Sequence, residues 1–135
     1  MKRVLIIDND LGFAFWLGHL LDAAGYSALP AKSVPDAALL VMQLQLKIDL
    51  LAINPSLNGA ADFIAALHRS QRNAAIIGVL NDPEQFVGIP AVRAAYAKPE
   101  VVNQMAKVQW LEHIEHALYG YSPLDESKSL FAVAH

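Results

Sequence analysis

The sequence contains no cysteine among its 135 residues, so disulfide bonds and thiolate chemistry are excluded. Long apolar runs are also missing. No segment approaches the roughly 20 apolar residues of a membrane span. Only four apolar residues separate Arg3 from Asp8, too few for the apolar core of a signal peptide. We therefore expect a cytoplasmic protein that does not associate with membranes.

Positive charge is sparse as well. Ten lysine and arginine residues stand against 13 acidic residues, the formal net charge is −3, and the basic residues form no stripe. A nucleic-acid partner is therefore not expected. Apolar residues, in contrast, make up 55% of the sequence, and the mean hydropathy is +0.31. This composition excludes a disordered chain and predicts a buried sheet together with a partner surface or a dimer interface.

The apolar residues occur in short runs that alternate with helical patterns. Runs typical of buried strands occupy residues 4–7, 26–31, 48–53, 74–80 and 92–97. Helical patterns or caps predict helices over residues 11–24, 34–46, 60–69 and 101–118. Only a short helix fits between the fourth and fifth strands. The alternation predicts one α/β domain, residues 1–118, built on a doubly wound five-stranded parallel sheet with a shortened fourth helix.

Residues 119–135 are expected to form a C-terminal tail. Its apolar residues suggest that it docks on its own domain or on a neighbour. An alternative is that the chain is the front part of a longer regulator, in which case the tail begins a linker.

In parallel sheets of this kind the functional crevice lies at the carboxyl ends of the strands. Five residues stand at or next to those ends and are therefore the candidates for chemistry: Asp8, Asn9, Asn54, Leu80 and Lys98.

Four segments in order carry a resemblance to a known family. They are residues 4–10 (VLIIDND), 25–26 (GY), 49–54 (DLLAIN) and 96–99 (YAKP). Over residues 2–118 the sequence resembles the CheY-like receiver domain of bacterial response regulators. The resemblance implies a flavodoxin-like fold and a place in two-component or phosphorelay signal transduction.

The resemblance also implies a chemistry that this sequence departs from. In a working receiver, an aspartate ending the third strand accepts a phosphoryl group, acids after the first strand hold Mg²⁺, and a lysine pairs with the phosphoryl oxygens. A hydroxyl residue on the fourth strand and an aromatic residue on the fifth then respond. The corresponding positions that have changed in this sequence are Asn9, Asn54, Leu80 and Ala95, and Tyr96 is one residue out of step. Asp8 and Lys98 alone are retained.

An amide nitrogen is not nucleophilic, so Asn54 cannot accept a phosphoryl group. We therefore expect a pseudo-receiver that is not an enzyme and holds neither metal nor cofactor. Its pocket should be neutralised by an Asp8–Lys98 pair, with Asn54 hydrogen-bonded inside it. The family also suggests a cis Lys98–Pro99 bond. The alternative is a phosphoryl-accepting response regulator that uses a displaced acid, Asp8 or Asp10.

A module without this chemistry would act by protein–protein interaction, with a signalling protein or histidine kinase and as a homodimer. The first helix is rich in large apolar residues and carries Asp22 as its only formal charge. Phe15 and Trp16 are therefore candidate partner contacts, and Trp110 is a candidate anchor on the last helix. The alternative, that all three belong to the core or are scattered surface residues, stays open.

Four residues of the last helix have a spacing that places metal ligands on one face: Glu112, His113, Glu115 and His116. We favour a solvated face near a helix C-terminus, where histidine is favourable against the helix dipole.

Overall fold

The computed structural model describes residues 1–82, 84 and 88–120. The chain forms two compact units, one of residues 1–98 and a second that begins at Pro99. The first unit holds a five-stranded sheet of order β2-β1-β3-β4-β5 in which all neighbours are parallel. Its strands are β1 (Arg3–Ile7), β2 (Ser27–Ala31), β3 (Leu50–Ile53), β4 (Ala75–Leu80) and β5 (Ala94–Ala97).

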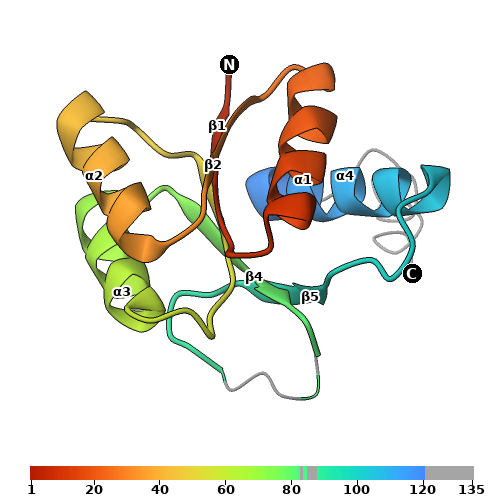
Figure 1. Cartoon of the computed structure of the whole chain (residues 1–135). Helices are drawn as coiled ribbons and strands as arrows, with labels where there is room; N and C mark the ends of the chain where they lie inside the picture. Colours follow the sequence, from red (N-terminus) through yellow and green to blue (C-terminus); the bar gives the residue numbers. More distant parts are fainter. Residues whose placement is uncertain (83, 85–87, 121–135) are drawn as a thin grey trace, which may run out of the picture. The chain divides into compact units, whose positions relative to one another are not determined.

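Three helices of the first unit cover both faces of this sheet. They are α1 (Leu11–Ala23), α2 (Val34–Leu44) and α3 (Ala60–Ser70). In Figure 1 α1 lies on one side of the strands, and α2 and α3 lie together on the other. The predicted doubly wound parallel sheet is therefore confirmed.

Local capping explains where the helices begin. Asp10 accepts a hydrogen bond from the Phe13 N–H across 3.1 Å and so caps α1. Ser33 accepts one from the Asp36 N–H across 3.2 Å at the start of α2. The chain leaves α1 through Gly25, whose φ of +94° is open to glycine at little cost.

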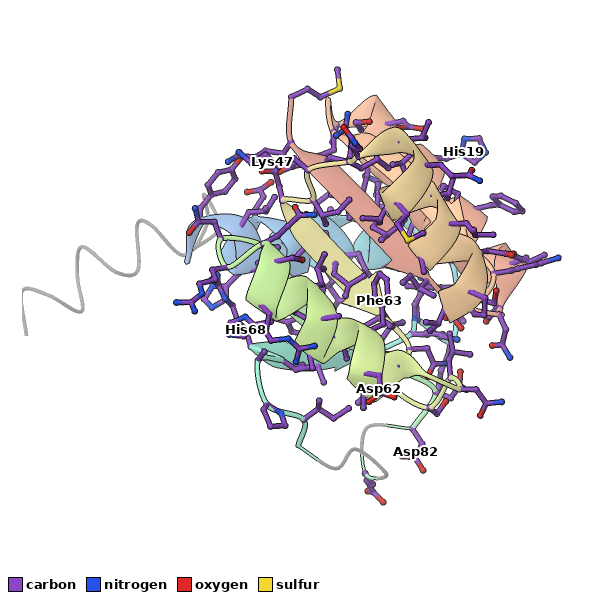
Figure 2. All side chains as sticks on the ribbon, turned by 90° about the vertical axis from the view of Figure 1, so that its left-hand side faces the viewer. His19, Lys47, Asp62, Phe63, His68 and Asp82 are labelled. Atoms are coloured by element: carbon purple, nitrogen blue, oxygen red, sulfur yellow. The ribbon has the colours of Figure 1, made fainter. Side chains whose placement is uncertain are left out.

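The central strands β1, β3 and β4 are almost completely buried, which is why they appear in the sequence as continuous apolar runs. Alternate side chains serve opposite faces. Leu5, Leu51 and Ile76 share one core with Ile64 of α3. Phe63 packs against this core from α3, as Figure 2 shows from the side of α2 and α3.

The segment between β4 and β5 was predicted to hold a short helix. Residues 83 and 85–87 lie outside the described residues. The remaining positions of residues 81–93 contain no α-helix. The described residues 88–93, through which the chain enters β5, are irregular, and Ile89, Ala91 and Val92 among them pack against the core of the first unit.

The second unit contains helix α4 (Gln104–Tyr119). Asn103 caps it by accepting a hydrogen bond from the Ala106 N–H across 2.9 Å, so the helix begins three residues later than predicted. Its buried residues follow a helical stripe: Ala106, Trp110, Ile114 and Ala117. The tail predicted to dock lies outside the described residues from residue 121 on. None of the helices in the described parts of the chain is long and apolar enough to cross a membrane.

Candidate functional site: a closed polar cluster at the carboxyl ends of the strands

The sheet itself brings the predicted site residues together. Ile7 and Ile53 are register partners, so Asp8 and Asn54 follow neighbouring strand ends. The Asn54 N–H donates to the Ile7 carbonyl across 2.9 Å, which continues the ladder into the site. On the other side, the Lys98 N–H donates to the Leu80 carbonyl across 2.9 Å. The parallel pairing therefore gathers Asp8, Asn54 and Lys98 at the end of the sheet where the strands have their carboxyl termini.

Asp8 and Lys98 form a buried ion pair. Lys98 Nζ lies 2.5 Å from Asp8 Oδ2, and the two side chains are 9% and 0% exposed. The second oxygen, Asp8 Oδ1, accepts hydrogen bonds from the Asp10 N–H and from Asn54 Nδ2, each across 3.2 Å. Both oxygens of this buried carboxylate are therefore engaged, as a buried charge requires.

Lys98 has two further contacts. Its Nζ lies 3.6 Å from Asp10 Oδ2 and 5.6 Å from the centre of the Phe13 ring, close enough for a cation–π interaction. Asp10 is half exposed and its other oxygen caps α1. The cluster thus surrounds one ammonium group with two carboxylates and an aromatic face.

Asn54 is held from both sides. Its Nδ2 donates to Asp8 Oδ1, and its Oδ1 accepts from the Ser56 N–H across 3.0 Å and from the Ser56 hydroxyl across 2.7 Å. The ionised Asp8 carboxylate only accepts, so the amide nitrogen must be the group that faces it. An aspartate at position 54 could not make this donor contact.

Mg²⁺ prefers several oxygen ligands in octahedral geometry. In this cluster the Asp8 oxygens are engaged by Lys98, Asp10 and Asn54, and Asn54 Oδ1 is engaged by Ser56. Only Asp10 Oδ2 keeps an open side. No group of three metal-ligating side chains occurs in the described parts of the chain. The residues present therefore do not fit the magnesium site that the resemblance implies.

The other predicted positions contribute no polar group to the cluster. Asn9 is exposed, and Leu80 is a buried apolar side chain. Ala95 is in register with Gly78, and Tyr96 with Val79, so Tyr96 and Ala95 face opposite sides of the sheet, as the strand period predicts. Partial burial raises the pKa of the Tyr96 hydroxyl.

The predicted cis Lys98–Pro99 bond is wrong. This peptide bond is trans, as are all others in the described residues. The trans form is the ordinary preference even before proline, by roughly 0.5–1 kcal/mol. The Asp8–Lys98 contact forms without the cis geometry.

The candidate partner residues differ in accessibility. Phe15 is 51% exposed on α1, which keeps it available to a partner. Trp16 is only partly buried, and its role stays a prediction. Trp110 is 2% exposed, so the interface anchor suggested for it is wrong. The reason is its place on the buried stripe of α4, where its ring meets His113 edge-on at 5.2 Å between centroids.

The four acidic and histidine residues of α4 provide no metal site among the described residues. Burial, helped by the nearby His116, lowers the pKa of His113. Burial, helped by Glu112, raises the pKa of Glu115.

Sequence reasoning missed two members of the cluster, Ser56 and Phe13. Ser56 follows Asn54 by two residues, the spacing at which an asparagine side chain closes a turn onto the backbone, and this signal was available. Phe13 offers no comparable signal, because its place beside Lys98 depends on the fold.

No family model and no curated protein sequence matches this chain. Solved structures do. A receiver domain from Methanospirillum hungatei superimposes with a TM-score of 0.70 at 19% identity, covering 87% of this chain and 94% of that one. The chain has the receiver fold. A putative response regulator from Chloroflexus aurantiacus gives a TM-score of 0.69 at 20% identity over 87% of this chain and 97% of the other.

A third receiver-fold structure is a Thermotoga maritima response regulator in complex with Mg²⁺-BeF. It matches with a TM-score of 0.62 at 20% identity, covering 82% of this chain and 99% of that one. At identities this low, the structural similarity establishes the shared fold alone. Function must be argued from the site.

Proposed function

We propose that this chain is a pseudo-receiver, a module of bacterial two-component signalling that acts by binding protein partners and accepts no phosphoryl group. One observation carries the proposal. The position that ends β3 is an asparagine whose amide is hydrogen-bonded on both sides, to Asp8 and to Ser56. An amide there offers neither a nucleophile nor a strong magnesium ligand.

The charges of the cluster support the same proposal. Asp8 and Lys98 neutralise each other directly, and Leu80 supplies no hydroxyl for a bound phosphoryl group. We propose a cytoplasmic location and a signalling protein or histidine kinase as the kind of partner. A homodimer belongs to the same proposal.

The alternative acceptors are unequal. Asp8 is buried, with both oxygens engaged, so a phosphoryl donor would have to displace Lys98 to reach it. Asp10 is half exposed and keeps one oxygen outside the helix cap. If any acid of this cluster accepted a phosphoryl group, Asp10 would be that acid.

The test is intact-mass analysis after incubation with acetyl phosphate and Mg²⁺, beside an active receiver as a positive control. We expect no adduct on this chain under conditions that modify the control. A stable adduct would refute the proposal, and its loss in Asp10→Asn but not in Asp36→Asn would assign the acceptor to Asp10.

A further inference from the structure

An apolar groove runs between α1 and α2 beside the edge strand β2. It encloses about 450 Å³ and lies wholly within the first unit. Apolar side chains of all three elements form most of its lining: Leu11, Phe15, Pro30, Leu39 and Leu40. Phe15 and Leu39 are each 51% exposed. Half-exposed apolar side chains from two helices around one hollow are typical of an interaction site.

The two helices that form the groove contain few charged residues. Asp22 is the only charged residue of α1, and Asp36 is the only one of α2. The outer helices of a domain usually carry charged residues on the face that is exposed to solvent. The scarcity of charged residues on both helices that line the groove favours a face that is covered by protein.

The outer edge of β2 excludes an extended peptide as the occupant of the groove. Ser27 and Ala31 use their backbone groups to bond β1, so the groups of Ala28 and Pro30 point outward. The Ala28 N–H already donates to Asp22 Oδ1 across 3.2 Å, and Pro30 has no N–H. An added strand would find no outward donor, so an extended peptide cannot extend the sheet here. The occupant must bind through side chains.

We infer that the groove binds a second copy of this chain, with the two grooves facing each other about a two-fold axis. Such an interface requires one surface that complements itself. Phe15 stands half exposed at the wall of a hollow bounded by Leu11, Pro30 and Leu39. A two-fold axis places the Phe15 ring of each copy in the hollow of the other.

The charges lining the groove complement each other in the same way. Lys32 and Asp36, of opposite sign, both line it. Across a two-fold axis, Lys32 of one copy meets Asp36 of the other, and two such pairs form. A partner of uniform charge would match one of these residues and repel the other, whereas a second copy matches both.

The inference rests on the proposed function, which already includes a homodimer, and it adds the face through which the two copies meet. The two can fail separately. Phosphoryl acceptance is read by mass, whereas the dimer is read by sedimentation of the unmodified protein.

The experiment is sedimentation velocity of the full chain from low to high micromolar concentration. We expect a monomer–dimer equilibrium in the wild type, and in Phe15→Glu a dimer dissociation constant raised by about tenfold or more, as for loss of an interface anchor. Met105→Glu is the matched control, because Met105 is 64% exposed on α4 in the second unit. It should leave the dimer unchanged.

A charge exchange tests the pairing directly. Lys32→Glu and Asp36→Lys should each weaken the dimer, and the double variant should recover most of the loss. Circular dichroism of each variant verifies the fold. A wild-type monomer throughout the range, or a dimer that survives Phe15→Glu, would overturn the inference. So would a dimer that only Met105→Glu dissociates, because the interface would then lie on the second unit.

Discussion

Asn54 Nδ2 donates to Asp8 Oδ1 across 3.2 Å, which joins the ends of two neighbouring strands through a buried side-chain hydrogen bond. The bond requires an amide at one position and a carboxylate at the other. Replacing the amide by a carboxylate at position 54 tests this requirement.

Asn54→Asp should destabilise the protein. The substitution replaces a donor by a second carboxylate beside the buried Asp8, and uncompensated buried charge costs about 3–5 kcal/mol. A divalent cation would offset the repulsion, so Mg²⁺ should raise the free energy of unfolding of this variant and leave the wild type unchanged. Urea denaturation in EDTA and in Mg²⁺ measures both.

Asn54→Ala is the control for that experiment, since it removes the same hydrogen bonds without adding charge. It should be destabilised without any response to Mg²⁺. An Asn54→Asp variant as stable as the wild type in EDTA would contradict the account of the cluster.

Lys98→Met should also destabilise the protein, because it leaves the buried Asp8 carboxylate without its cation. The expected loss is about 3–5 kcal/mol in the free energy of unfolding. Dimer formation should persist wherever the variant is folded, since Lys98 lies outside the groove. Urea denaturation and sedimentation provide the two readouts.

The double variant Asp8→Asn/Lys98→Met removes both charges. If the ion pair accounts for the loss, the double variant should be more stable than Lys98→Met alone. A double variant that is less stable than Lys98→Met would show that Lys98 contributes mainly through packing, for example against Phe13.

Stability should depend on pH through His113. Burial lowers its pKa below the ordinary value of 6.5, so the unfolded chain takes up the proton more readily than the folded one. Stability should therefore fall as pH decreases from 6.5 toward the lowered pKa, and reach a constant penalty below it. Urea midpoints across this window measure the slope.

His113→Gln should flatten that slope. His19→Gln is the comparison, because His19 is exposed on α1, and it should leave the slope as it is. Glu115 works in the opposite direction at lower pH, since its pKa is raised and its protonation favours the folded state. An unchanged slope in His113→Gln would assign the pH dependence to another group.

The edge of β2 supports a fourth prediction. Pro30→Val combined with Asp22→Ala should free two outward N–H donors on this strand. An edge strand with free donors pairs readily with other chains, so aggregation on mild heating should accelerate by several-fold. Light scattering follows it, and Asp22→Ala alone should give a smaller effect. Equal rates in the wild type and the double variant would contradict the role given to this edge.

The fold was predictable because its signals are local. Buried parallel strands appear as continuous apolar runs, and Asp10 and Ser33 mark the first turns of their helices as caps. The sequence predicts the start of α4 three residues early, because Val101 and Val102 extend the apolar pattern to the N-terminal side of the Asn103 cap.

The site was predictable only in part. Asp8, Asn54 and Lys98 could be found because strand ends converge at one edge of a parallel sheet. The burial of Trp110 could not, since α4 carries apolar residues on more than one face and the sequence does not say which face is covered. The trans Lys98–Pro99 bond follows the ordinary preference of X–Pro bonds, whereas the family resemblance predicts the cis form.

Under the proposed function, the amide of Asn54 also affects how long a signal from this chain lasts. A receiver that gains and loses a phosphoryl group has a lifetime for its signal, set by how fast that group is removed. Under the proposed function the signal of this chain has no such lifetime, because Asn54 is already hydrogen-bonded and Asp8 is already ion-paired within the cluster. The number of its complexes would depend on how many copies of the chain the cell holds. The strength of its signal would therefore be set by synthesis and degradation of the chain.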